Sequence, residues 1–150
     1  MLPIRKIICP TDFSEPSFKG IEAAVELAEH FSAELILVNV ITPAYPFVSG
    51  VPAKFDMEQY REELLRHATE SLGTISKDRI PDGVGTRKVV RQGSAVDEII
   101  QLAESEHADL IVIATHGWTG WRKWIFGSIA DKVVHLAPCP VLTVSEPEKK

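Results

Sequence analysis

The chain is poor in cysteine, in net positive charge and in long apolar runs. Its two cysteines, Cys9 and Cys139, make no disulfide framework, and neither lies at metal-ligand spacing from another cysteine. A formal net charge of -5 disfavours nucleic acid or an anionic membrane as a partner. No apolar run approaches the roughly 20 residues that cross a bilayer, and no secretory signal pattern opens the chain. These absences indicate a cytoplasmic protein with no membrane or nucleic-acid partner.

Several motifs of nucleotide-using enzymes are also absent. The sequence has neither G-x-G-x-x-G after its first apolar run nor G-x-x-x-x-G-K-[ST], which disfavours dinucleotide binding and P-loop chemistry. It lacks S-G-G-x-[DS] and H-x-G-H, so an adenylating enzyme ranks last among the alternatives. Ser14 and Ser128 have no histidine and acid partners at recognisable spacing, so nucleophilic hydrolysis has no support. The five histidines are scattered and predict no metal site.

Short apolar runs alternate with amphipathic ones along the chain. The apolar runs predict strands at residues 4–9, 35–41, 84–91, 110–114 and 141–144. Helical periodicity follows Ser14, covers residues 57 to about 75, follows Gly93 and covers residues 127–136. The order predicts one α/β domain over residues 1–150, a five-stranded parallel sheet with helices on both faces. The weakly apolar third strand and the short last strand are expected at the edges of this sheet.

The loop after the fourth strand is the most informative segment of the chain. It carries Gly117 and Gly120, and Gly127 and Ser128 stand where the last helical run begins. Glycines between a strand and a helix let backbone N–H groups approach an anion, and the helix N-terminus adds donors and partial positive charge. Phosphate is the usual anion at such a place. If the first and fourth strands are neighbours where the strand order reverses, Asp12 faces this loop.

The spacing in this loop resembles that of the universal stress protein family. Ala114, Gly117, Gly127 and Ser128 match G-x2-G-x9-G-[S/T], the motif of its nucleotide-binding members, with alanine in place of the first glycine. The blocks IICPTDFSE, RQGSA, ADLIVIATHG and APCPVLTV resemble the family's other landmarks, so the likeness covers nearly the whole chain. The resemblance implies a Rossmann-like fold of the adenine nucleotide alpha hydrolase type and a regulatory protein of the stress response that binds ATP.

Carried over residue by residue, the resemblance implies a nucleotide site. Asp12 would lie near the ribose, the two residues before it would line the base, and the backbone of Val40 would meet the adenine edge. Ser128 would bind a terminal phosphate oxygen. The cofactor would be ATP, AMP or ADP, with Mg²⁺ held through the phosphates and no metal ligand from the protein. The implied cofactor-binding residues are Pro10, Thr11, Asp12, Val40, Ala114, Gly117, Gly127, Ser128 and Ile129.

Three features of this site allow a second interpretation. Ser128 with Asp131 also fits the S-x-x-D pattern of helix capping. Asp12 is equally a turn residue, or an N-cap candidate together with Ser14. The methyl group of Ala114 would clash if the position needs a positive φ or a close approach of the ribose, but it would cost little in extended backbone. We expect a competent site because the other motif positions and Asp12 are present.

The expected protein is a homodimeric regulator that is not an enzyme. No general base or arginine finger is visible, so slow ATP hydrolysis or autophosphorylation is the most that we expect. The last strand leaves an open edge that invites a second copy. The resemblance implies a homodimer through this strand, residues 141–144 (Val141, Leu142, Thr143 and Val144). The alternative is a nucleotide-free interaction dimer in which Ala114 closes the site.

Other expectations concern the loops and the thiols. Trp121 and Trp124 have helical spacing and are expected to pack in the core. Trp118 is either an aromatic flap over the nucleotide or a contact for an unknown protein partner. The segment 42–56 is expected to form a lid over the site. Cys9 and Cys139 are expected to be buried, unreactive thiols separated by the fourth strand.

Overall fold

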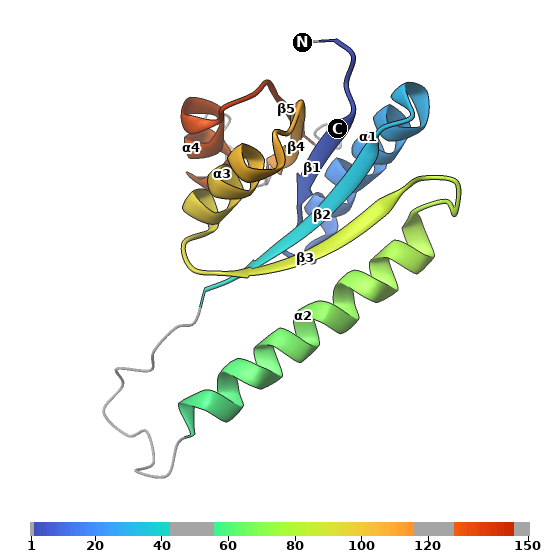
Figure 1. Cartoon of the computed structure of the whole chain (residues 1–150). Helices are drawn as coiled ribbons and strands as arrows, with labels where there is room; N and C mark the ends of the chain where they lie inside the picture. The colour runs from blue at the N-terminus through green and yellow to red at the C-terminus, as the bar shows by residue number, and fades with distance from the viewer. Residues whose placement is uncertain (1, 43–55, 116–127, 146–150) are drawn as a thin grey trace, which may run out of the picture.

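The structure is a computed structural model that describes residues 2–42, 56–115 and 128–145 (Figure 1). Strands and helices alternate along these residues, as the sequence predicts. The strands are β1 (Lys6–Pro10), β2 (Glu34–Ile41), β3 (Thr86–Gln92), β4 (Leu110–Thr115) and β5 (Val141–Ser145). The helices are α1 (Glu15–Phe31), α2 (Met57–Arg79), α3 (Ala95–Glu106) and α4 (Ser128–Leu136). The main differences from the prediction are that β1 includes Pro10 and that α2 continues to Arg79.

The five strands form one parallel sheet in the order β3-β2-β1-β4-β5. The first and fourth strands are therefore neighbours, and the strand order reverses between them. The third and fifth strands lie at the two edges. All three statements confirm the predictions from the sequence. Ligands of such sheets bind beside the reversal point, at the carboxyl ends of the strands.

Both faces of the sheet are buried because successive strand side chains point to opposite faces. One set packs with α1 and α2, and the other packs with α3 and α4 (Figure 1). The first core contains, among others, Ile7, Leu35, Leu37 and Val112 with Ile21 of α1 and Leu72 of α2. The second contains, among others, Ile8, Ile36, Val38 and Ile111 with Ile99 of α3 and Val133 of α4. Continuous apolar strands are thus explained by burial on both sides.

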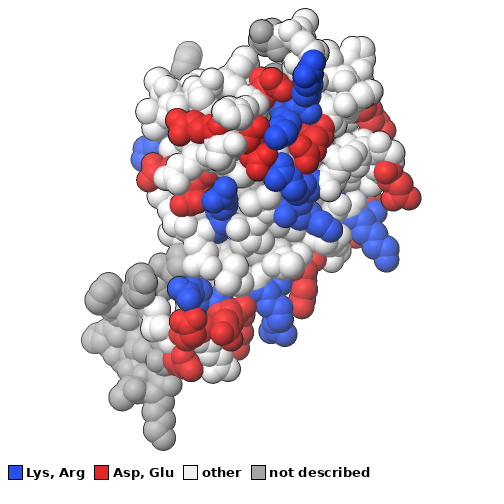
Figure 2. All heavy atoms as spheres, viewed as in Figure 1, with Lys and Arg blue, Asp and Glu red and all other residues white. Residues whose placement is uncertain are grey.

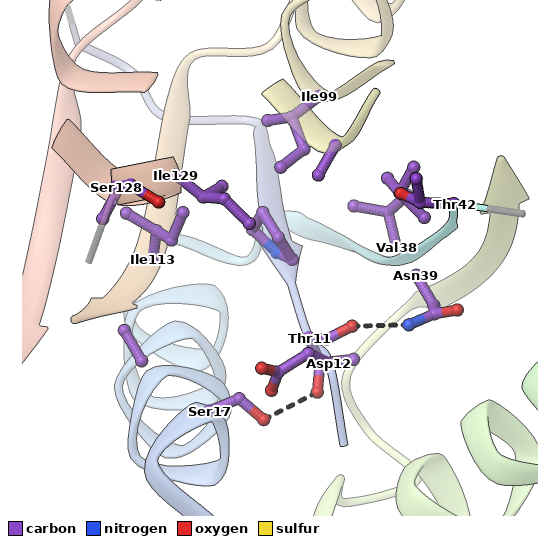
Figure 3. A pocket seen from close by; sticks show the side chains of 15 residues that line it. Thr11, Asp12, Ser17, Val38, Asn39, Thr42, Ile99, Ile113, Ser128 and Ile129 are labelled. Atoms are coloured by element: carbon purple, nitrogen blue, oxygen red, sulfur yellow. Dashed lines mark hydrogen bonds between the residues drawn. The ribbon is translucent and has the colours of Figure 1, made fainter. Parts of the chain in front are cut away.

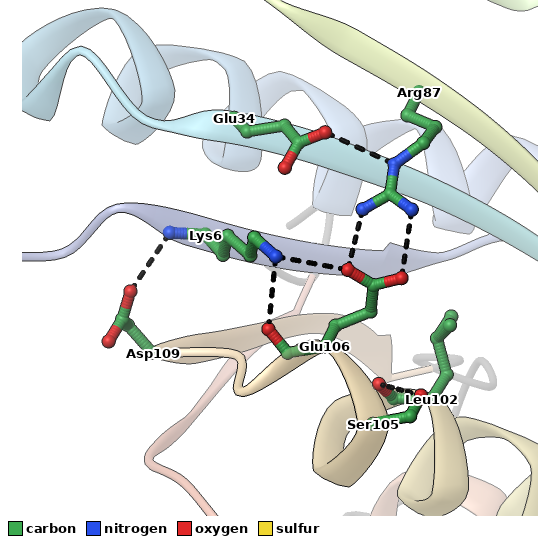
Figure 4. A network of polar contacts seen from close by, with 7 residues as sticks. All are labelled: Lys6, Glu34, Arg87, Leu102, Ser105, Glu106 and Asp109. Carbon is green, nitrogen blue, oxygen red and sulfur yellow. Dashed lines mark hydrogen bonds and ion pairs between the residues drawn. The ribbon is translucent and has the colours of Figure 1, made fainter.

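A network of charged side chains ties the amino ends of three strands to the last turn of α3 (Figure 4). The Glu106 carboxylate accepts hydrogen bonds from Arg87 at 2.8 and 2.6 Å and from Lys6 Nζ at 3.1 Å. Arg87 also donates to Glu34 at 3.1 Å. The hydrogen bonds from Arg87, then those from Lys6, hold the pKa of Glu106 at about 2. Asp109 accepts from the backbone N–H of Lys6 at 2.9 Å, which adds a hydrogen bond between β1 and the start of β4 at the same end of the sheet.

Figure 2 shows basic and acidic side chains interspersed over the face that it presents. No helix of the described residues is long and apolar enough to cross a membrane.

The two cysteines lie on either side of β4. Cys9 is buried in β1, and this burial raises the pKa of its thiol to about 12. Cys139 precedes β5 and is only half-buried, so the expectation of a buried thiol holds fully for Cys9 alone. Burial also raises the pKa of the Cys139 thiol.

Candidate functional site

A cavity of about 250 Å³ opens at the carboxyl ends of β1, β2 and β4, beside the reversal of strand order (Figure 3). Its walls come from these strand ends and from the first turns of α1, α3 and α4. Seven of the nine predicted site residues line it: Pro10, Thr11, Asp12, Val40, Ala114, Ser128 and Ile129. The other two, Gly117 and Gly127, lie outside the described residues. The structure therefore brings together residues that are up to 119 positions apart, counted from Pro10 to Ile129.

One side of the cavity is an apolar slot. Val38 and Val40 of β2, Ile99 of α3 and Ile113 of β4 line it, together with Ala130 of α4. Val38, Ile99, Ile113 and Ala130 belong to the core on the α3 and α4 side of the sheet, and Val40 packs against it. Among the described lining residues, the one charged side chain is that of Asp12. A flat, apolar ring suits this slot, while hydrogen bonds would come from its rim.

The backbone of Val40 presents a donor and an acceptor at this rim. The pairing of β1 with β2 ends at Val38, whose carbonyl accepts the Thr11 N–H at 2.9 Å. Successive residues of a central strand direct their N–H and C=O groups alternately to the two neighbouring strands. Val40, two residues on, therefore points to the side of β1, where the chain has already turned away toward α1. The N–H and C=O groups of Val40 lie at the cavity instead of facing another strand.

Asp12 is at once a turn residue and a cavity residue. One carboxylate oxygen, Oδ1, accepts hydrogen bonds from the Ser14 N–H at 3.0 Å and from the Ser14 hydroxyl. Ser14 is the N-cap of α1, because its hydroxyl oxygen accepts the Ser17 N–H. The choice between Asp12 and Ser14 as the cap is thus decided for Ser14. The side chain of Asp12 is exposed and lines the cavity, so the turn does not withdraw it from a ligand.

The methyl group of Ala114 lies against α1. Ala114 belongs to β4 and pairs with Val144, so its backbone is extended, and the described residues other than glycine with a positive φ are Phe13, Ser32 and His107. A Cβ atom built on Gly20 of α1 would lie 3.3 Å from the Cβ of Ala114 and 3.2 Å from its N. The missing side chain of Gly20 therefore makes room for the methyl group. The alternative that Ala114 needs a positive φ does not apply.

Two buried polar residues of the cavity were not among the predicted site residues. Asn39 is 8% exposed and donates from Nδ2 to the Thr11 carbonyl at 2.9 Å. Ser17 is 4% exposed and shares a hydrogen bond of 2.8 Å with the Thr11 hydroxyl. Asn39 had a signal in the sequence, since it is the one polar residue in the apolar run LILVNVI. Ser17 had none beyond its place near the start of a helix.

Other predictions fall outside the described residues. These include the glycines and the tryptophans of residues 116–127, and most of the expected lid, residues 43–55. The phosphate-binding loop, the flap and the lid therefore stay predictions. Ser128 and Ile129, which follow the loop, are the exposed first residues of α4 and line the cavity.

Comparison with known proteins decides the family. The family model described as "Universal stress protein family" matches residues 3–145. The chain belongs to the universal stress protein family. A curated relative, universal stress protein MJ0531 of Methanocaldococcus jannaschii, is 36% identical over 146 residues, which are 97% of this chain and 85% of the relative.

Solved structures of universal stress proteins share the fold. That of MJ0577, also from M. jannaschii, is similar with a TM-score of 0.79 and 25% identity, covering 97% of this chain and 99% of the other. A universal stress protein in complex with cAMP has a TM-score of 0.66 at 20% identity, with 95% and 97% of the two chains covered. An Arabidopsis thaliana family protein with AMP bound has a TM-score of 0.64 at 19% identity, with 95% and 92% covered. The doubly covered parallel sheet of this universal stress protein is thus the fold of its family.

Proposed function

We propose that this universal stress protein binds an adenine nucleotide in the cavity beside β1 and β4 and acts as a nucleotide-dependent regulator. One observation carries the proposal: predicted site residues from β1, β2, β4 and α4 line a single cavity at the reversal of strand order. The AMP and cAMP complexes of structural neighbours support the same class of ligand. ATP, ADP and AMP all belong to this class.

The chemistry of the cavity fits the parts of such a nucleotide. Adenine would occupy the apolar slot, with the N–H and C=O groups of Val40 paired to the acceptor and donor on its edge. The Asp12 carboxylate would accept hydrogen bonds from the ribose hydroxyls. Ser128 opens α4, so its hydroxyl and the amides of the first turn would meet a phosphate. The position of the Ala114 methyl group against Gly20 supports a slot that the base can enter.

The charge of the phosphates needs a cation in addition to these groups. Among the described lining residues no lysine or arginine is present, and Asp12 adds a negative charge. We expect Mg²⁺ to be held mostly through the phosphate oxygens. Within residues 2–42, 56–115 and 128–145, no cluster of histidine, cysteine and acidic side chains would hold a metal by itself. Among the described lining residues the one carboxylate, that of Asp12, is assigned to the ribose, so slow hydrolysis or autophosphorylation is the upper limit that we propose.

The free edge of the sheet at β5 supports a homodimer as the working form. β5 reads VLTVS and pairs with β4 alone among the described strands. Leu142 on this strand is 40% exposed, and Leu136 at the end of α4 is 59% exposed. An uncharged edge strand with apolar neighbours is a template for a second strand. We place the dimer contact on residues 141–144 and the protein in the cytoplasm, with a protein partner still to be identified.

Isothermal titration calorimetry with Mg-ATP and with AMP tests the proposed ligand. The wild-type protein should bind saturably, and Asp12→Asn should weaken binding about tenfold, because the ribose hydroxyls would meet a neutral amide in place of a charged carboxylate. Glu106→Gln is the matched control, since it makes the same carboxylate-to-amide change at the opposite end of the sheet and should leave the affinity within about twofold. Undetectable binding to the wild type at millimolar nucleotide would reject the proposal and leave the nucleotide-free interaction dimer.

Analytical ultracentrifugation tests the dimer separately. Leu142→Lys places a charge on the exposed edge strand and should convert a dimer into a monomer. Lys88→Leu on the opposite edge strand is the control and should leave the dimer intact. A wild-type protein that sediments as a monomer at all concentrations would reject the β5 contact without affecting the nucleotide proposal.

A further inference from the structure

The turn between β1 and α1 contains an unusual backbone conformation next to Asp12. Phe13 has φ 66°, in the left-handed region that side chains with a Cβ rarely adopt. A bulky residue in this region is kept there only when its surroundings overdetermine it.

A chain of hydroxyl groups holds the turn from inside. The Phe13 N–H donates to Thr11 Oγ1 at 3.1 Å, and Thr11 Oγ1 lies 2.8 Å from Ser17 Oγ. Ser17 Oγ donates to the Ser14 carbonyl at 2.7 Å. Because a serine hydroxyl has a single proton, Thr11 must be the donor in its bond with Ser17. Each hydroxyl in the chain therefore donates its proton within the turn, and none is left to donate to a ligand.

Thr11 is in turn fixed to the sheet. Its N–H donates to the Val38 carbonyl at 2.9 Å, and its own carbonyl accepts from Asn39 Nδ2 at 2.9 Å (Figure 3). Thr11 and Ser17 are 5% and 4% exposed. On the other side of Asp12, the ring of Phe13 packs on the core formed with α1 and α2. It contacts the His67 ring edge-on, with 6.3 Å between the two ring centroids. Asp12 thus stands between two anchored residues.

We infer that Thr11 and Ser17 are positioning residues: their hydroxyl chain holds Phe13 in the left-handed region and so aims the Asp12 carboxylate at the ribose. The inference rests on the proposed function and deepens it. The consequence is selectivity for the sugar. A carboxylate held in one direction distinguishes a ribose with both hydroxyls from a deoxyribose, whereas a loosely held carboxylate does not.

The test compares AMP with 2′-deoxy-AMP and 3′-deoxy-AMP by calorimetry. The wild-type protein should prefer AMP about tenfold over the analogue that lacks the hydroxyl bound by Asp12. Asp12→Asn should reduce this ratio toward one. Ser17→Ala should weaken the binding of AMP about five- to tenfold. It should weaken the binding of the analogue that lacks the hydroxyl bound by Asp12 less than twofold, so that the ratio of the two affinities falls in the same way.

Thr11 provides the matched pair of variants. Thr11→Ser keeps the hydroxyl and should retain the wild-type ratio, whereas Thr11→Val keeps the shape and should lose it. This pair decides the matter if Ser17→Ala does not fold, as judged by circular dichroism.

Two results would overturn the inference while leaving the proposed function intact. One is equal weakening of all three ligands by Ser17→Ala and Thr11→Val, which would indicate a general structural role. The other is a wild-type protein that binds AMP and both analogues equally. Absence of binding of any of these nucleotides would instead reject the proposed function itself.

Discussion

The two ends of the sheet use polar residues in opposite ways. At the amino ends of the strands, the cations Lys6 and Arg87 and the carboxylates of Glu34 and Glu106 neutralise one another in one network. At the carboxyl ends, hydroxyl and amide groups hydrogen-bond to one another within a turn, and the carboxylate of Asp12 lies on the wall of a cavity. The same strands therefore end in a charge network on one side of the sheet and in the proposed binding site on the other. Substitutions at the two ends should separate these properties.

The largest effect is expected from Gly20→Val, which should lower stability and nucleotide affinity together and so remove the contrast between the two ends of the sheet. A side chain at this position meets the backbone N and the Cβ of Ala114 at 3.2 and 3.3 Å, so α1 must move away from β4. We expect a loss of about 3 kcal/mol in the free energy of unfolding, measured in urea, together with weaker nucleotide binding. Gly73→Ala in α2 is the control, since nothing lies within 4 Å of the added methyl group. Gly73→Ala should raise the free energy of unfolding by up to about 1 kcal/mol. A Gly20→Val protein as stable as the wild type would contradict the tight contact between Gly20 and Ala114.

Glu106→Gln, at the amino ends of the strands, should lower stability without changing nucleotide affinity. It removes the charge that pairs with Arg87 at 2.6 Å and with Lys6 at 3.1 Å. We expect the free energy of unfolding to fall by about 1 kcal/mol, the upper range for a partly exposed ion pair, with nucleotide affinity unchanged. Glu58→Gln breaks an exposed pair with Arg61 and should cost less than about 0.5 kcal/mol. If both variants lose the same free energy of unfolding, the network around Glu106 stabilises the protein no more than an isolated surface ion pair does.

The stability of the protein should depend on pH through the carboxylate of Glu106. Pairing lowers the pKa of Glu106 from 4.5 to about 2, so the folded protein binds this proton more weakly than the unfolded chain does. The contribution is therefore fully present above about pH 5 and is lost as the pH falls from there toward 2. Urea midpoints of the wild type and of Glu106→Gln should converge over this window. A difference between them that stays constant down to pH 2.5 would contradict the lowered pKa.

The smallest effect is expected from Ala114→Gly at the carboxyl end. Removing the methyl group that lies against Gly20 should lower the free energy of unfolding by about 1 kcal/mol or less. Nucleotide affinity, measured by calorimetry, should change less than about twofold because the methyl group faces α1. A tenfold gain in affinity would show instead that the methyl group obstructs the ligand.

Local patterns in the sequence were sufficient for the elements and their order. The apolar run containing Leu35 and Ile36 predicts a strand buried on both faces, and the periodicity around Ile21 and Val25 predicts a helix on it; both follow from burial alone. The ends of the elements were less predictable. Pro10 was expected to end the first strand, yet it pairs with Val38 as the last residue of β1. Its missing N–H is tolerated at a strand end, where one ladder bond is dispensable.

The residues of the candidate site likewise fall into those that the sequence predicts and those that only the structure shows. Asp12, Val40 and Ser128 follow from motif spacing and from a family resemblance, because each stands at the end of a strand or the start of a helix. Asn39 and Ser17 did not emerge, because their role depends on hydrogen bonds to Thr11 that span 28 and 6 positions. Spacing in the chain contains no information about which of several buried polar groups will meet.

By itself, the sequence determined the alternation of strands and helices, the parallel sheet and the residues at the carboxyl ends of its strands. Periodicity and turn chemistry are local, and parallel strands connected by helices leave few topologies. Only the tertiary structure decided where the Ala114 methyl group points, that Gly20 makes room for it, and that Phe13 adopts a left-handed conformation beside Asp12. These features depend on packing between elements and on hydrogen bonds whose partners are set only once the sheet and its helices have come together.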